Sequence, residues 1–203
     1  MSSNYFDRVS STYSKSCKTG IHGSFKSKEA KGLRSALLRH YPDSYKGNLI
    51  DIGCATGFYT EELRTVYKNL HFTGVDPSSG MIEAYRKLGL RGVHSNVESL
   101  AGESVESFDI FLACGVLEFV KDVDRFVQSI KAMSARESTL FAIVPKMGLI
   151  SLGYFLHHKL MNEIYIRSLK SYIHAFQTHG FKDVESVNLT AISELLIFKI
   201  EKK

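Results

Sequence analysis

Cysteine and proline are scarce in this chain, and it has no apolar run long enough to span a membrane. The three cysteines, Cys17, Cys54 and Cys114, show neither Cys-x-x-Cys nor Cys/His spacing, which argues against a disulfide framework and against a zinc site. No basic start followed by an apolar stretch opens the chain, so we expect no signal peptide. Together these absences predict a cytoplasmic protein with no metal site.

Charge is distributed unevenly along the 203 residues. The net charge is +5, and residues 1–47 carry nine basic side chains against three acidic ones, while the rest of the chain is nearly neutral. Such a segment is typical of a solvated helix face. It would also suit an anionic partner such as RNA, a phosphorylated substrate or an acidic carrier protein. The sequence leaves these interpretations open.

Apolar, β-branched runs alternate with segments of helical periodicity. The strand-like runs are 48–53, 71–76, 92–96, 108–114 and 139–144, and the helical segments are 57–69, 78–88 and 122–133. This alternation predicts an α/β fold with a parallel sheet covered by helices on both faces. The only three prolines, Pro42, Pro77 and Pro145, fall where these segments begin or end, which supports the boundaries.

The chain is short enough to form one domain. We divide it into four parts: an N-terminal helical segment at 1–47, a core at 48–145, an insertion at 146–172, and a closing helix with two strands at 173–203. Within the first part, residues 24–40 have the spacing of an amphipathic helix, with Leu33, Leu37 and the aliphatic stem of Lys26 on one face. A shorter helix is expected at 4–14.

The stretch LIDIGCATGFYT, residues 49–60, ends an apolar strand in a turn with almost no side chains. Gly53 and Gly57 let a ligand approach the backbone closely, and the helix that follows presents free amide groups. In an open α/β sheet, ligands bind beyond the carboxyl ends of the strands, where the strand order reverses. The turn therefore predicts a binding site, although a tight turn without a ligand fits the same residues.

Asp76 ends the next strand, 23 residues after Gly53. A carboxylate there is placed to accept hydrogen bonds from both ribose hydroxyls, in dinucleotide proteins and in adenosyl-cofactor proteins alike. Ala55 replaces the second glycine of a dinucleotide fingerprint and no third glycine follows Gly57, which weighs against a pyrophosphate. Asp51 adds a negative charge that repels a phosphate and attracts an amino group or a sulfonium.

These motifs, in this order, make the chain similar to the class I S-adenosylmethionine-dependent methyltransferases, and in particular to small-molecule enzymes of ubiquinone and biotin pathways. LIDIGCATGFYT resembles the first motif of that family, GVDPSSGMI the second and FDIFLACGVLEFV the fourth, while YFDRVSSTYS resembles its N-terminal lid. The resemblance implies a Rossmann-like sheet of seven strands, mostly parallel with an antiparallel last strand. It also implies methyl transfer from S-adenosylmethionine to a small, partly hydrophobic acceptor, with S-adenosylhomocysteine as the product.

The resemblance also implies which residues contact the cofactor. Asp76 would bind the ribose, Met81 would form a wall of the adenine pocket, and Asn96 stands where the family often has an acid against the adenine amine. Tyr13 would lie near the methionine end, or would only pack the lid against the sheet. The full set of implied cofactor residues is Tyr13, Asp51, Gly53, Cys54, Ala55, Gly57, Asp76, Pro77, Met81, Asn96, Val97, Cys114 and Gly115.

A general base is needed only for some methyl acceptors, and O-, N- and C-methylation all stay open here. Glu118 is the first candidate because its loop follows the carboxyl end of a central strand, and His22 in the lid is the second. Tyr154, His157 and Tyr165 are candidate substrate residues in the apolar insertion. The insertion would roof the acceptor pocket, or would simply pack on the sheet.

Two other classes of function compete with this hypothesis. A methyltransferase that acts on RNA, on protein or on a carrier-bound substrate would use the basic N-terminal segment. Against it, CGVLEF stands where methylators of bases and amides carry an N-P-P-[YF] signature, so a nucleic-acid partner is not favoured. A non-catalytic cofactor-binding module would keep the same motifs, and the residues leave that alternative open.

Overall fold

The computed structural model describes residues 3–103, 106–148 and 163–201. The elements, in chain order, are α1 (Ser3–Lys18), α2 (Gly20–His40), β1 (Gly47–Ile52), α3 (Phe58–Arg64), β2 (Leu70–Asp76), α4 (Ser79–Arg86), β3 (Arg91–His94), α5 (Val97–Glu103), β4 (Phe108–Cys114), the 3-10 helix η1 (Leu117–Phe119), α6 (Val123–Met133), β5 (Ser134–Pro145), α8 (Leu169–Thr178), β6 (Lys182–Asn188) and β7 (Ser193–Glu201). Strands and helices therefore alternate as the periodicity predicts.

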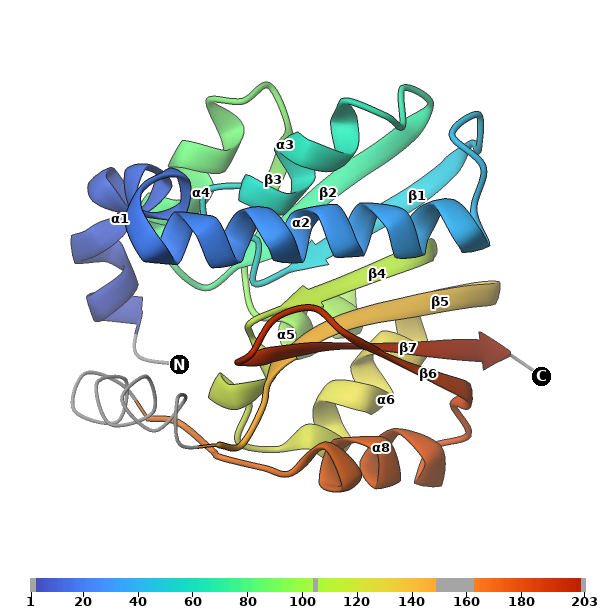
Figure 1. The fold of residues 1–203 in the computed structure, drawn as a ribbon. Coiled ribbons are helices and arrows are strands. Elements are labelled where there is room, and N and C mark those ends of the chain that lie inside the picture. The colour runs from blue at the N-terminus through green and yellow to red at the C-terminus, as the bar shows by residue number, and fades with distance from the viewer. Residues whose placement is uncertain (1–2, 104–105, 149–162, 202–203) are drawn as a thin grey trace.

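The strands form one seven-stranded sheet in the order β3-β2-β1-β4-β5-β7-β6. β1 pairs in parallel with β2 and β4, whereas β7 pairs antiparallel with both β5 and β6. The predicted Rossmann-like fold with an antiparallel last strand is confirmed. Because the strand order reverses between β1 and β4, a crevice forms at the carboxyl ends of these strands. Figure 1 shows α1 at this edge of the sheet.

Alternate residues of the central strands face two different apolar layers, as the two-residue period of a strand requires. On one face, Leu49 of β1 packs in a buried cluster with Leu33 and Leu37, which confirms the predicted apolar face of α2. On the other face, Ile50 and Phe111 belong to a second cluster that includes residues of α6 and α8. In the described part of the chain, no helix is both long and apolar enough to cross a membrane.

Several elements differ from the sequence prediction. α1 and α2 extend beyond 4–14 and 24–40, and β5 begins at Ser134; the sequence prediction stopped short because most of the added residues are polar and carry no apolar period. α5 was not predicted; Asn96 caps it, since its Oδ1 accepts a hydrogen bond from Ser99 N at 2.7 Å. Much of the expected insertion lies outside the described residues.

Candidate active site

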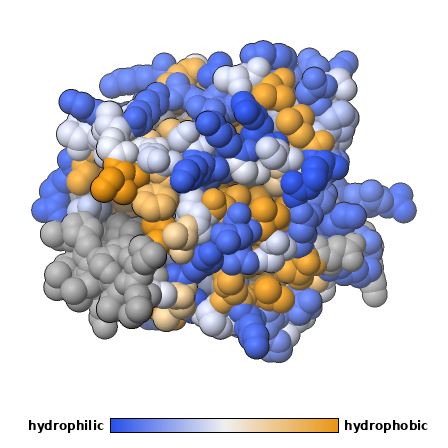
Figure 2. Space-filling model, in the orientation of Figure 1, coloured by the Kyte–Doolittle hydropathy of each residue, from blue (hydrophilic) through white to orange (hydrophobic). Residues whose placement is uncertain are grey.

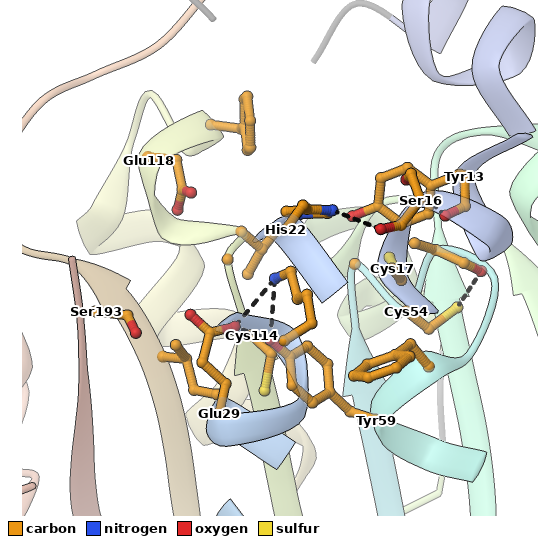
Figure 3. A pocket seen from close by; sticks show the side chains of 18 of the residues that line it. Tyr13, Ser16, Cys17, His22, Glu29, Cys54, Tyr59, Cys114, Glu118 and Ser193 are labelled. Carbon is orange, nitrogen blue, oxygen red and sulfur yellow. Dashed lines mark hydrogen bonds and ion pairs between the residues drawn. The ribbon is translucent and has the colours of Figure 1, made fainter. Parts of the chain in front are cut away.

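A cavity of about 390 Å³ lies at the carboxyl ends of the parallel strands, under α1 and the first turns of α2. Its walls come from these two helices, the turn after β1, the end of β2, η1 and the neighbouring ends of β5 and β7. Apolar rings line part of it, among them Phe6, Phe25 and Phe119. Polar groups from segments far apart in the sequence line the rest (Figure 3).

The turn after β1 has an unusual backbone. Gly53, Ala55 and Gly57 have φ angles of +66°, +46° and +85°. An alanine at position 53 would be strained at this φ, and its Cβ would lie 2.8 Å from Val116 Cγ2. Gly53 N donates a hydrogen bond to Val75 O at 2.8 Å, which ties the turn to β2. The turn therefore brings bare backbone to the cavity wall.

Asp76 joins this turn to the one that follows β2. Its Oδ2 accepts a hydrogen bond from Ala55 N at 3.0 Å, and its Oδ1 accepts one from Ser78 N at 2.9 Å. The first bond holds Ala55 in a left-handed conformation that alanine rarely adopts. Burial raises the pKa of the Asp76 carboxyl by more than these two bonds lower it. Asp76 lines the cavity, and these two hydrogen bonds, one to each carboxylate oxygen, fix its position.

Asp51 lies in β1, below the turn. It is 2% exposed, and its Oδ2 accepts a hydrogen bond from Thr60 Oγ1 at 2.7 Å. Burial raises the pKa of this carboxyl to about 7, although the Thr60 hydroxyl opposes the shift. Asp51 is not among the residues that line the cavity. In this structure it supports the turn from beneath, through the helix that follows it.

Helix α1 is fastened over the cavity by Asp7. Its Oδ1 accepts hydrogen bonds from Ser78 Oγ at 2.6 Å and from Gly80 N at 3.1 Å, so α1 caps the N-terminus of α4. A Cβ at Gly80 would lie 2.7 Å from Ser10 Oγ, which shows how closely the two helices approach. On the cavity side, the Phe6 ring packs edge to face against the Phe119 ring, with 5.6 Å between the ring centroids. α1 thus bridges the β2 and β4 ends of the site.

A largely buried polar cluster of Lys26, Glu29 and Tyr59 also lines the cavity. Lys26 Nζ donates to Tyr59 Oη at 3.0 Å and lies 3.3 Å from Glu29 Oε2, and Tyr59 Oη donates to the same Oε2 at 2.5 Å. Burial opposes the charge on Lys26, but Tyr59 and Glu29 together keep the pKa of its ammonium above the ordinary value. Burial likewise opposes the charge on Glu29, and Lys26 brings the pKa of that carboxyl below its ordinary value.

Comparison with known proteins agrees with this geometry. The family described as "Methyltransferase domain" matches residues 50–142. The chain contains a methyltransferase domain. The resemblance to class I methyltransferases is therefore confirmed, and the domain includes the turn after β1, Asp76 and the end of β4.

Two curated relatives are methyltransferases of small or carrier-bound compounds. The ubiquinone biosynthesis O-methyltransferase of Methylocella silvestris is 30% identical over 140 residues, which cover 60% of this chain and 54% of the relative. The malonyl-[acyl-carrier protein] O-methyltransferase of Bacillus anthracis is 24% identical over 105 residues, which cover 51% of this chain and 39% of the relative. The chain thus matches little more than half the length of these relatives, or less.

Solved structures share the fold of this methyltransferase domain. The N-methyltransferase NodS of Bradyrhizobium japonicum, in complex with S-adenosyl-L-homocysteine, aligns with a TM-score of 0.73 at 15% identity, over 97% of this chain and 96% of that one. Human N-acetylserotonin methyltransferase, in complex with SAM, aligns with a TM-score of 0.75 at 13% identity, over 99% of this chain and 57% of that one. At such identities the likeness concerns the fold alone.

The structure brings nine of the predicted site residues to the cavity wall: Tyr13, His22, Gly53, Cys54, Ala55, Asp76, Cys114, Gly115 and Glu118. Seven others lie outside its lining: Asp51, Gly57, Pro77, Met81, Asn96, Val97 and Tyr165. Tyr154 and His157 lie outside the described residues. The contacts predicted for all of these residues stay predictions.

Some of the seven have other partners in the structure. Met81 is fully buried, and Asn96 is exposed and caps α5. Tyr165 Oη donates to Glu163 Oε2 at 3.0 Å, while its backbone N–H donates to Glu118 O at 2.7 Å. Tyr165 therefore fixes the backbone of η1 in this structure, and its side chain turns to a neighbour on its own segment.

Sequence reasoning missed Lys26, Glu29 and Tyr59. Lys26 was placed on the apolar face of the 24–40 helix, but only its aliphatic stem was considered. A lysine and a glutamate three residues apart on that face were the available signal, since charged groups are buried only when paired. Tyr59 follows the glycine turn directly, and only the folded chain shows that its hydroxyl meets α2.

Proposed function

We propose that this protein transfers a methyl group from S-adenosylmethionine to a small, partly hydrophobic acceptor. The observation that carries the proposal is the pairing of a fixed Asp76 carboxylate with the bare turn from Gly53 to Gly57 in one cavity. The carboxylate suits the ribose, and the bare turn gives room for the amino-acid part of the cofactor. The names of the relatives support methyl transfer as the reaction.

The residues present fit this cofactor. Gly115 lines the cavity with a φ of +71°, and among the described residues a Cβ there would find only Glu118 Oε1 and Lys26 Nζ within 4 Å, both at 3.9 Å. The cavity therefore widens at the end of β4, beside the turn after β1. Because Glu29 pairs with Lys26, the carboxyl groups of Asp76 and Glu118 leave the charged side chains of the cavity lining acidic in sum, which favours a positively charged sulfonium.

S-adenosylmethionine supplies an already activated methyl group, so the protein has three tasks. The lid α1 excludes water, because Phe6 and Tyr13 cover the cavity. The apolar rings hold the acceptor in position, and positioning alone accounts for much of the acceleration of such a transfer. Glu118, at 2% exposure beside the widened space, takes a proton from acceptors that carry one.

The test is the affinity for S-adenosylhomocysteine, measured by titration calorimetry on the wild type, Asp76→Ala and Asp43→Ala. Asp43 is an exposed carboxylate outside the cavity lining and serves as the matched control. We expect Asp76→Ala to weaken binding at least about tenfold, equal to about 1.4 kcal/mol, and Asp43→Ala to leave it unchanged. Equal affinity in all three proteins would refute the proposed cofactor site.

We propose that the basic N-terminal segment is a solvated helix face and does not bind an anionic partner. Lys26 is largely buried and pairs with Glu29, while Lys18 and Arg39 pair with Glu61 and Glu185. Part of the positive charge is thus used inside the molecule, and hydrophilic side chains cover much of the face that Figure 2 draws. We propose a small-molecule acceptor and a cytoplasmic location, in keeping with the three free cysteines. Salt-dependent retention on RNA would argue for a nucleic-acid substrate instead.

A further inference from the structure

The end of β4 separates two opposite charges. Lys26 Nζ and Glu118 Oε1 each lie 3.9 Å from the point where a Cβ of Gly115 would stand. Both residues line the cavity, and the glycine between them has no side chain to fill the space. In Figure 3, Glu118 lies well apart from Tyr59, the residue whose hydroxyl accepts a hydrogen bond from Lys26. A group placed above Gly115 therefore meets a cation and an anion at once.

The ammonium is held in place with hydrogen-bonding capacity to spare. Of its three N–H bonds, two are directed by contacts to Tyr59 and Glu29. Burial disfavours its charge, but those two neighbours keep the pKa of Lys26 above the ordinary value, so it stays protonated at neutral pH. Within the part of the chain that the structure describes, the third N–H is then available to a ligand atom in the cavity. It is a donor only, because a protonated lysine has no lone pair to offer.

The number of lone pairs decides which acceptor atom suits this pair of groups. A hydroxyl oxygen has two lone pairs, so one can accept a hydrogen bond from Lys26 while the other attacks the methyl group. A neutral amine nitrogen has one lone pair, which must attack and cannot also accept from Lys26. An ammonium group would be repelled by Lys26. The site therefore favours oxygen over nitrogen.

We propose that the acceptor atom is the hydroxyl oxygen of a phenol, held by Lys26 and deprotonated by Glu118. The aromatic rings of Phe6, Phe25 and Phe119 in the same cavity favour an aromatic acceptor. In the transfer, the O–H bond breaks and its proton passes to Glu118. The oxygen forms a bond to the methyl carbon, and the S–CH3 electron pair returns to sulfur as a neutral thioether. This inference rests on the proposed function.

The experiment uses the full chain loaded with S-adenosylhomocysteine and two probes of one skeleton, 4-butylphenol and 4-butylaniline. Calorimetry measures the affinity for each probe in the wild type, Lys26→Met, Lys26→Arg and Lys28→Met. Lys28 is exposed on the same helix and gives the matched control. We expect the wild type and Lys28→Met to bind the phenol at least about tenfold more tightly than the aniline. Lys26→Met should lose this preference, and Lys26→Arg, which keeps the charge, should retain part of it.

Three results would overturn the inference. One is equal affinity of the loaded wild type for the two probes, or no measurable binding of the phenol. Another is an unchanged phenol preference in Lys26→Met. The third is that Lys26→Met loses affinity for S-adenosylhomocysteine but keeps it for 5′-methylthioadenosine, which lacks the amino-acid part; Lys26 would then bind the carboxylate of the cofactor. Failure of the wild type to bind S-adenosylhomocysteine at all would instead refute the proposed function.

Discussion

Five acidic or basic side chains are wholly or largely buried around one cavity or directly beneath it, and each has different neighbours. Lys26 and Glu29 form an ion pair and stay charged. Asp51 has a hydroxyl as its hydrogen-bond partner, so burial dominates and its pKa rises to about 7. Asp76 accepts two backbone hydrogen bonds, and Glu118 lies in η1 at 2% exposure. Carboxyl groups in one region of the protein therefore have different surroundings, which suit them to different roles.

The raised pKa of Asp51 predicts a loss of stability with increasing pH. In the unfolded chain this carboxyl titrates near 3.8, and in the folded protein near 7, so the native state binds the extra proton between these values. Its contribution is fully present below about pH 4 and falls by about 1.4 kcal/mol per pH unit up to pH 7. In Asp51→Asn this contribution is absent. Urea unfolding of both proteins from pH 4 to 8 should show that the free energy of unfolding of the variant rises relative to that of the wild type up to pH 7. If the two free energies changed in parallel with pH, the raised pKa of Asp51 would be contradicted.

The Lys26–Glu29 pair predicts strong non-additivity. Glu29→Gln leaves the Lys26 ammonium buried without its counter-charge, and we expect a loss of about 3 kcal/mol in the free energy of unfolding. Lys26→Met leaves Glu29 in the same situation. The double variant removes both charges, so its loss should be smaller than the sum of the two single losses. Urea unfolding measures all three, and additive losses would show that the two charges do not interact.

At the scale of elements, the lid and the cofactor side of the sheet are mechanically connected. Asp7 of α1 bonds to Ser78 and Gly80, and the Ser78 N–H bonds to Asp76. The lid is therefore attached to the same turn that positions the carboxylate expected to bind the ribose. An element that covers a site through few contacts opens more readily than the core.

Asp7→Ala should loosen α1 without unfolding the sheet. It removes charge-assisted hydrogen bonds to Ser78 and Gly80, so we expect amide hydrogen exchange in α1 to speed up about tenfold, equivalent to about 1.4 kcal/mol, with little change in β1 and β4. Ser11→Ala, an exposed position on the same helix, is the control. Exchange in α1 that matches the wild type would show that Asp7 does not fasten the lid.

At the scale of the whole molecule, the cavity is assembled from both ends of the chain. Lys26 and Glu29 come from α2, Tyr59 follows β1, and Ser193 at the start of β7 also lowers the pKa of Glu29 by hydrogen bonding. A ligand in this cavity contacts elements from much of the sheet and from the lid. Binding should therefore stabilise the whole fold rather than one local region.

Saturation with S-adenosylhomocysteine should raise the melting temperature. At a ligand concentration about 100 times the dissociation constant, binding adds about 2.7 kcal/mol, which for a domain of this size corresponds to roughly 5–10 °C. The measurement is a thermal unfolding scan at fixed protein concentration. Asp76→Ala should show a smaller shift at the same ligand concentration, and a shift as large as that of the wild type would argue against its role in binding.

The sequence by itself determined the alternation of strands and helices, the glycine turn after β1 and the place of Asp76 at the end of β2. These features follow from local hydrophobic periodicity and from the backbone conformations that single residues such as glycine allow. They can therefore be recognised within about a dozen positions of the sequence. Only the tertiary structure decided that Lys26 and Glu29 meet Tyr59, and that Asp7 caps α4. Those contacts join residues 30 to 73 positions apart. No local pattern specifies them, because they depend on how the elements pack.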